Sequence, residues 1–591
     1  MSKIQSLLVI IILTLINFWV IPISSSFNSP LNHLYNVGDH VPFFANIVGP
    51  LNNPSETYEY YELPFCSPDQ IIKKKESLGE VLNGDRLTKT RYDIKFKEIK
   101  EENILCTKTL KREEVTKFRD AVQREFYFQM HYDDLPFWGF VGKNEEENLR
   151  SDWKGPRSYL FTHVQFEVLY NDKHVVEVRA FSDPEHVVDI TEDTEIDVKF
   201  TYSAIWNASS ATFATRMSRY SRASLLPPVQ QLHRFSLISS AVVFMLSVTL
   251  VVMLYRWNLK SDLRKYFHGD DDNEAGRACV DGDILRIPSH VSLLCAVLGC
   301  GTQIFLVICC VFVLMSLSII EPYSHGTVWA SVVAMYTLTS AVAGYTTVSF
   351  YCQFAKTGWE RSVLLTGIIL MGPVLLVLSV LNTVAVLYGA TAALPLGTII
   401  LLFLIYLFIT MPFLALGGIV GHHYACRKPL PSPKRSSREI PPLAWYMKTQ
   451  SQVVVGGLLP FSGILVELHL FYASLWSYKL FTQPGVLFVT FSILICLTAV
   501  LSIGLTFIQL AAEDPRWWWR SVLRGGSTAI FMFAYSLYFY TTSDMSGFLQ
   551  LTYFLGINFC ICYAFFLMLA AISFRASSVF TSHLYNASKR E

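Results

Sequence analysis

The chain has 591 residues, of which 52% are hydrophobic and only 16% are charged, and its mean hydropathy is +0.36. Soluble domains carry roughly 25% charged residues, so this composition excludes a chain built only of soluble domains and indicates a membrane protein. The 48 Lys and Arg residues nearly balance the 47 Asp and Glu residues, which excludes the basic surface typical of nucleic-acid-binding proteins.

The first segment has the pattern of a secretory signal peptide. Lys3 precedes an apolar run over residues 7–23, and three serines follow at 24–26. A basic start, an apolar middle and small residues at the exit are typical of a cleaved signal; an uncleaved signal anchor is the alternative. Either one places the next segment in the ER lumen. We assign residues 1–26 to the signal peptide.

Residues 27–234 are expected to form a lumenal β-rich domain. Apolar and polar residues alternate over 163–168, 174–181 and 196–202, and Asn171-Asp172 separates the first two runs. Period-two alternation with a short Asn/Asp turn is typical of antiparallel strands with one wet face. We therefore predict a β-sandwich-like domain, with a more helical and charged stretch at 108–124.

Two covalent features are predicted in this domain. Cys66 and Cys106 are its only cysteines, and in an oxidising lumen such a pair is expected to form a disulfide; two buried free thiols are the alternative. Asn207 begins an Asn-Ala-Ser sequon and would be available for glycosylation.

Apolar stretches long enough to cross a bilayer dominate the rest of the chain, residues 235–575. A transmembrane helix needs about 20 mainly apolar residues. We predict nine spans, at 235–255, 293–320, 327–354, 363–388, 394–420, 452–476, 485–511, 525–542 and 549–574.

The flanking charges predict the orientation of these spans. The loops after the odd-numbered spans, together with residues 576–591, carry nearly all the flanking Lys and Arg residues, whereas the short loops on the other side carry only Lys479. Basic residues accumulate on the cytosolic side, so we expect a lumenal N-terminus and a cytosolic C-terminal tail. A second sequon, at Asn586, should then remain unglycosylated.

Several distinctive motifs follow one another along the chain. They are a tyrosine-rich segment ending in Pro-Phe-Cys at 58–66, Leu-Gly-Glu with Gly-Asp-Arg at 78–86, Asp-Asp-Leu-Pro with Trp-Gly at 133–139, Gly-Asp with Arg and Pro at 282–288, Gly-Gly-Leu-Leu-Pro-Phe with Glu at 456–467, and Glu-Asp-Pro-Arg-Trp-Trp-Trp-Arg-Ser at 513–521. In this order they resemble the motifs of the nonaspanins, the transmembrane 9 superfamily. The resemblance implies an α+β membrane protein, in which a lumenal β-sandwich-like domain precedes a nine-helix transmembrane bundle. Pro515 and His469 depart from the residues that the family often carries at these positions.

The chain ends in Lys589-Arg590-Glu591, which resembles the family's C-terminal Lys-x-Asp/Glu signal. That signal implies binding of Lys589 and Glu591 to the COPI coatomer and retention in the Golgi. A tail lysine and two carboxylates can pair with a complementary coat surface. The alternative is a solvated charge cluster that only fixes the topology.

Glu467 and His469 are ionisable residues inside the predicted sixth span. Such groups are costly in hydrocarbon and are functional candidates by default. Residues two apart do not share a helix face, so we do not expect them to pair; Gln303 or Asn558 could bond to Glu467 instead. Glu467 is interpreted as a proton or cation relay, as a helix-packing contact or as a snorkelling side chain.

Small residues recur in the predicted spans, at 299–301, 341–344, 417–418 and 456–457. They allow close approach of helices, either within the bundle or against transmembrane segments of client proteins, as the family resemblance implies. Trp517, Trp518 and Trp519, flanked by arginines, resemble an interfacial anchor that could contact membrane lipid.

No catalytic motif of the common kinds is present, so we expect a protein that is not an enzyme and has no metal or cofactor. The resemblance implies a Golgi and endosome membrane glycoprotein that sorts client membrane proteins and helps to localise them. An ion or solute transporter that uses Glu467 is the rival hypothesis, although no inverted repeat supports it.

Overall fold

The computed structural model of the chain describes two regions, a β-rich domain and a helical bundle. It covers residues 33–145, 157–213, 216, 230–267, 288–317, 319–320, 326–425, 448–476, 484–511, 514 and 516–588. The predicted signal peptide therefore lies outside the described residues.

The N-terminal domain is β-rich, as predicted, and most of its strands are antiparallel. Its five-stranded sheet has the order β2-β1-β5-β6, with β3 also paired to β1; a four-stranded sheet has the order β10-β9-β12-β4, and a three-stranded sheet the order β11-β8-β7. The pair β9 and β12 is parallel. The strands are β1 (Phe43–Pro50), β2 (Tyr58–Glu59), β3 (Thr88–Lys89), β4 (Lys100–Leu110), β5 (Phe126–Tyr132), β6 (Leu135–Phe140), β7 (Gly142–Glu145), β8 (Arg157–Phe161), β9 (His163–Asn171), β10 (His174–Ser182), β11 (Val187–Asp189) and β12 (Ile196–Ala208).

The three alternating segments form strands; β9 and β12 bury mainly one face, whereas β10 buries the four consecutive residues from Val175 to Val178. Phe166 and Val168 of β9 are buried together with Val198 and Phe200 of β12 in the core of the domain. Asp172 adopts a φ of +52° in the turn between β9 and β10, a conformation that Asp tolerates better than most residues. The helical expectation for 108–124 is met by α3 (Arg112–Gln123), and α2 (Leu78–Asn83) is a second short helix.

Among the residues that the structure describes, eight helices of the helical region are long and apolar enough to cross a membrane. The predicted eighth span, 525–542, lies in α14, which does not meet that criterion. α14 nevertheless packs inside the bundle against α12, α13 and α15. The helices are α5 (Gln230–Phe267), α7 (Val291–Ser316), α8 (Thr327–Tyr351), α9 (Trp359–Tyr388), α10 (Leu396–Ile405), η4 (Tyr406–Thr410), α11 (Met411–Ala425), α12 (Thr449–Trp476), α13 (Pro484–Ala511), α14 (Trp517–Thr542) and α15 (Phe548–Ser588).

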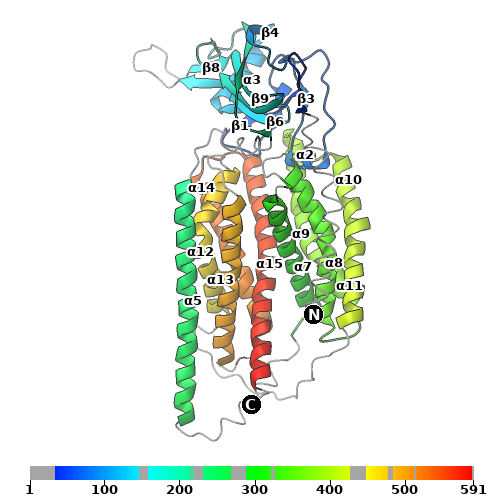
Figure 1. Ribbon diagram of the computed structural model, residues 1–591, viewed down its shortest axis with the longest axis vertical. Coiled ribbons are helices and arrows are strands. Elements are labelled where there is room, and N and C mark those ends of the chain that lie inside the picture. Colours follow the sequence, from blue (N-terminus) through cyan, green and yellow to red (C-terminus); the bar gives the residue numbers. More distant parts are fainter. Residues whose placement is uncertain are drawn as a thin grey trace.

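α15 occupies the middle of the bundle. It packs against α7 and α9 on one side and against α13 and α14 on the other, and Figure 1 shows it running between the two groups of helices. It begins beside the β-rich domain and ends at the opposite end of the bundle. The C-terminal end of α15, at Ser588, therefore lies far from the β-rich domain.

The β-rich domain rests on the helix connections at one end of the bundle (Figure 1). The Thr57 hydroxyl lies 2.6 Å from that of Thr391, after α9, and Arg86 donates to the Ala393 carbonyl at 2.7 Å. Asn53 accepts a hydrogen bond from the Ser546 amide, between α14 and α15. These bonds come from two separate helix connections, so they fix both the position and the rotation of the domain.

Candidate functional site

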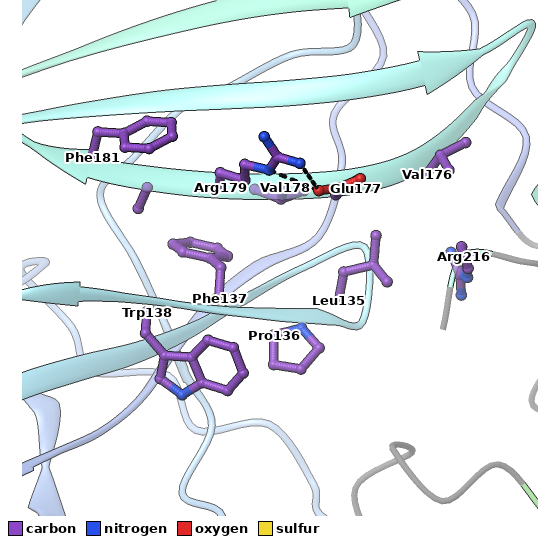
Figure 2. Close-up of a pocket in the computed structure, with 11 residues that line it drawn as sticks. Leu135, Pro136, Phe137, Trp138, Val176, Glu177, Val178, Arg179, Phe181 and Arg216 are labelled. Atoms are coloured by element: carbon purple, nitrogen blue, oxygen red, sulfur yellow. Dashed lines mark hydrogen bonds and ion pairs between the residues drawn. The ribbon is translucent and has the colours of Figure 1, made fainter. Parts of the chain in front are cut away.

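A pocket of about 120 Å³ lies between the edge strands of two sheets, β6 and β10. Figure 2 shows Leu135 and Phe137 rising from β6 toward β10. Phe181 of β10, which is 49% exposed, also lines the pocket. The Ser182 hydroxyl donates to the Phe140 carbonyl at 2.9 Å and joins the two strands.

The charged lining of this pocket is paired within the domain. Arg179 contacts Glu177 at 2.5 Å, as the dashed line in Figure 2 marks. Arg216 also lines the pocket and forms an ion pair with Asp133 at 2.9 Å. The pocket is therefore an apolar recess with compensated charges at its border, and it is large enough for one apolar side chain. Part of its lining belongs to the Asp-Asp-Leu-Pro and Trp-Gly motif.

The Asp133 carboxylate joins three segments that lie far apart in the sequence. It accepts hydrogen bonds from the Tyr35 hydroxyl at 2.6 Å and from Arg216 at 2.9 Å, and it contacts His33 Nδ1 at 2.7 Å. Burial, together with the charge of Asp133, raises the pKa of Tyr35, so this phenol stays protonated and donates. Asp133 and Asp134 both have positive φ in the β5–β6 turn, which matches the right-handed twist of the hairpin.

A histidine of this domain is buried in its neutral form. His163 Nδ1 lies 2.8 Å from the Thr201 hydroxyl, and Nε2 lies 2.9 Å from that of Ser203. Burial, and next to it the neighbouring ring of His186, lower the pKa of His163 below its usual value. The structure of the domain therefore opposes protonation of this residue.

The predicted disulfide is present in the domain, and the asparagine of the predicted glycosylation site is exposed. Cys66 and Cys106 form a disulfide with Cα atoms 6.1 Å apart, which joins the tyrosine-rich segment to β4. Asn207 is exposed on β12, and its amide donates to Glu167 at 2.9 Å. The position leaves the side chain accessible to a glycosyltransferase.

The two intramembrane candidates point in different directions, as their spacing predicts. Glu467 is 1% exposed, in the interior of α12, whereas His469 is exposed and lies 2.9 Å from the Tyr535 hydroxyl. Neither suggested partner of Glu467 is bonded to it. Gln303 donates to the Tyr336 carbonyl at 2.9 Å, and the buried amide of Asn558 has no hydrogen bond within the described part of the chain.

The small residues that we considered as a docking face lie inside the bundle. A Cβ atom added to Gly417 would collide with the Ala341 carbonyl of α8, and one added to Gly344 with the Leu414 carbonyl of α11. Gly299 faces Thr347, and Gly457 faces Ser527. These glycines serve contacts between helices of the same chain, so they do not present a surface to another protein.

The tryptophan motif is a packing element rather than an anchor on the membrane surface. Trp517 and Trp518 are 1% and 7% exposed, and their rings stack with centroids 4.3 Å apart. Trp517 also stacks on Phe574 of α15. Only Trp519 reaches the border of the bundle, where its indole donates to the Ser289 carbonyl at 2.7 Å.

A polar network in the half of the bundle away from the β-rich domain was not predicted from the sequence. Arg524 of α14 is 1% exposed and donates to Gln452 of α12 and to Thr506 and Gln509 of α13. Thr506 continues the network to Ser577 of α15 at 2.8 Å. The spacing of Arg516, Arg520 and Arg524, which places them on one helix face, was the available signal.

The remaining predicted site lies beyond the end of α15. Lys589 and Glu591 are outside the described residues. α15 ends at Ser588, directly before them.

Comparisons with known proteins identify the family. The profile of the family Endomembrane protein 70 matches residues 57–548. Transmembrane 9 superfamily members 5 and 4 of Arabidopsis thaliana are 49% and 46% identical to this chain, over 99% and 98% of each of the paired sequences. Transmembrane 9 superfamily member 1 of Mus musculus is 36% identical over 93% of both chains. No solved structure matches. Together with the β-rich domain and the bundle of membrane-spanning helices, these matches show that the chain belongs to the transmembrane 9 superfamily.

Proposed function

We propose that this protein sorts client membrane proteins in the Golgi and endosomes. In this proposal the β-rich domain lies in the lumen, and the C-terminal Lys-x-Glu signal binds the COPI coatomer in the cytosol. The course of α15 carries the proposal, because this helix begins beside the β-rich domain and ends at the opposite end of the bundle. A protein with these two ends can engage clients on one side of a membrane and a coat on the other.

The surfaces available to clients are limited by the packing of the bundle. The glycines described above contact other helices of the same chain. The surfaces that remain for clients are therefore the lipid-facing helices and the β-rich domain. In the most apolar stretch of α5 only 17% of the residues are buried inside the protein, and in that of the segment from α10 to α11 only 11%. The pocket between β6 and β10 accommodates one apolar side chain of a lumenal segment. Client contact through these surfaces would be a binding function, which agrees with relatives that are named as membrane proteins and not as enzymes.

The tail is tested by changing both residues of the signal. Lys589→Ala with Glu591→Ala should move the full-length protein out of the Golgi and abolish binding of a tail peptide to purified coatomer. Arg590→Ala is the matched control, because the motif leaves this position free, and it should behave as wild type. Golgi retention and coatomer binding by the double variant would refute this part of the proposal.

A transporter remains the second candidate, because Glu467 is buried inside a membrane-spanning helix. A buried carboxylate within the bilayer is a plausible ion or proton site. The discriminating measurement is flux of protons or cations into liposomes that contain the purified protein. Flux that disappears with Glu467→Gln would support the transporter. No flux with wild type would remove this candidate.

A further inference from the structure

The interior of the bundle contains a positive charge that no described residue of the chain pairs with. Arg524 is fully buried, and its described hydrogen-bond partners are the neutral oxygens of Gln452, Gln509 and Thr506, at 2.7 Å for Gln452 and 3.2 Å for Thr506. No carboxylate among the described residues forms an ion pair with it. An unpaired charge in a low-dielectric interior is costly, so a counter-ion would stabilise the folded bundle.

The charges nearest along the helix do not offset Arg524. Arg520, one helical turn away, pairs with Asp514 at 2.7 Å, and Arg516 pairs with the same carboxylate at 3.2 Å. One described carboxylate therefore already serves two arginines. Among the described residues this cluster holds Arg516, Arg520 and Arg524 against the single carboxylate of Asp514, so an ion that completes it should be an anion.

Two hydrogen-bond donors beside this charge have no acceptor among the described residues. Arg524 Nε and Gln509 Nε2 are both buried, and neither donates to a described atom. The amide that carries Gln509 Nε2 also accepts from Arg524 through its oxygen, so the two donors belong to side chains that touch. Buried donors are nearly always paired. Two donors without a described acceptor beside a buried cation therefore indicate that a negatively charged acceptor binds at this place.

Hydroxyl groups lie on one side of Arg524, and a glycine on another side leaves room for it. The hydroxyls of Thr506, Ser502 and Ser521 each lie 2.7–2.8 Å from the Ser577 hydroxyl, so this cluster connects α13, α14 and α15. On the α12 side, a Cβ atom at Gly456 would lie 3.1 Å from the Cβ of Arg524. The donors left without a described acceptor are thus a guanidinium N–H and an amide N–H, and both can bind an anion.

We propose that Arg524 and Gln509 bind a monatomic anion, with chloride as the physiological candidate. The site lies between α12, α13 and α14 in the half of the bundle away from the β-rich domain. It is independent of the sorting function proposed above, and it would make the stability of the bundle depend on anion concentration, because a ligand that binds only the folded state raises its stability.

The test is the unfolding temperature of the purified full-length protein in a phosphate-free maltoside detergent. Replacing potassium gluconate with potassium chloride at equal ionic strength should raise the unfolding temperature of wild type by a few degrees, and the effect should saturate with chloride. Arg524→Gln should lose the response. The matched control is Arg516→Gln, whose side chain is 61% exposed, and it should keep the response.

A second variant keeps the test decisive if Arg524→Gln does not fold. Gln509→Glu places a carboxylate where the anion would act, so this variant should be more stable than wild type in gluconate and insensitive to chloride. The proposal is overturned if wild type has the same unfolding temperature in both salts. It is also overturned if Arg524→Gln or Gln509→Glu retains the full chloride response, since the anion would then bind elsewhere.

Discussion

Asp133 is the residue through which three distant segments of the β-rich domain are joined. Its carboxylate is 1% exposed and bonds to His33, Tyr35 and Arg216. Arg216 is itself 4% exposed and follows the last strand, so this ion pair holds Arg216 against the β5–β6 turn. Loss of one partner would leave the other charge buried and uncompensated.

Asp133→Asn should therefore destabilise the β-rich domain by about 3 kcal/mol, within the range for a broken buried ion pair. Asn tolerates the positive φ of this turn, so the loss of stability would result from removal of the negative charge and not from backbone strain. Asp134→Asn is the control, because its neighbour Lys74 lies 3.6 Å away at a half-exposed site and such pairs contribute less than about 1 kcal/mol. Thermal unfolding of the full-length protein measures both; equal losses would contradict the assignment.

His163 should make the domain sensitive to acid. Its pKa is lowered by burial and then by His186, so the folded state favours the neutral ring. The resulting stabilisation is complete above the unfolded pKa of about 6.5 and is lost as the pH falls from there toward the lowered value. Between about pH 7.5 and pH 5.5, the unfolding temperature of wild type should drop more than that of His163→Gln.

The control for this pH dependence is His40→Gln. The His40 side chain is 76% exposed, so this variant makes the same substitution without removing a buried ring. If His163→Gln shows the same acid sensitivity as wild type, another group causes it.

At the scale of the helix, the glycine contacts explain which positions tolerate a side chain. Gly417 of α11 has no room for a Cβ atom, because the Ala341 carbonyl occupies that space, whereas Gly397 of α10 has nothing within 4 Å. Gly417 and Gly397 both lie in helices, so the two positions differ in packing and not in helix propensity.

Gly417→Ala should cost about 1–3 kcal/mol through overpacking of the α8–α11 contact. Gly397→Ala should be neutral, or gain up to about 1 kcal/mol from helix propensity. The unfolding temperatures of the two purified variants give the comparison. A stable Gly417→Ala variant would mean that α8 and α11 are not packed as described.

The sequence predicted these elements unevenly, for physical reasons. The strands at 163–168 and 196–202 and the apolar spans were predictable because alternation and hydropathy report burial directly. The two additional turns of α14 before residue 525 were not, because hydropathy treats Arg520 and Arg524 as loop residues and cannot detect that Gln452, Gln509 and Thr506 solvate a buried guanidinium. The interior position of the glycines depends on the partner helix, which a single sequence does not identify.

At the scale of the whole molecule, the β-rich domain and the bundle form one docked unit. The Thr57 and Thr391 hydroxyls are 2.6 Å apart across the junction. Motion of the domain relative to the helices would have to break this contact together with those of Arg86 and Asn53. A client bound by the domain would therefore be held at a fixed position over the bundle.

A double variant, Thr57→Cys with Thr391→Cys, tests this docking. The close approach of the two side chains suits a disulfide, so the pair should oxidise during passage through the secretory pathway. The bond is detected as a change in electrophoretic mobility that a reducing agent reverses. Neither single variant should show it. Absence of the bond in the double variant would show that the domain does not rest on the α9–α10 connection.

The central claim is that the β-rich domain and the tail after α15 lie on opposite sides of the membrane. Glycosidase treatment of the cell-expressed protein tests it most directly, because one sequon, at Asn207, lies in the domain and another, at Asn586, lies near the end of α15. We expect a mobility shift for wild type and for Asn586→Gln, and none for Asn207→Gln. A shift that persists in Asn207→Gln but disappears in Asn586→Gln would contradict the topology and, with it, coat binding by the tail.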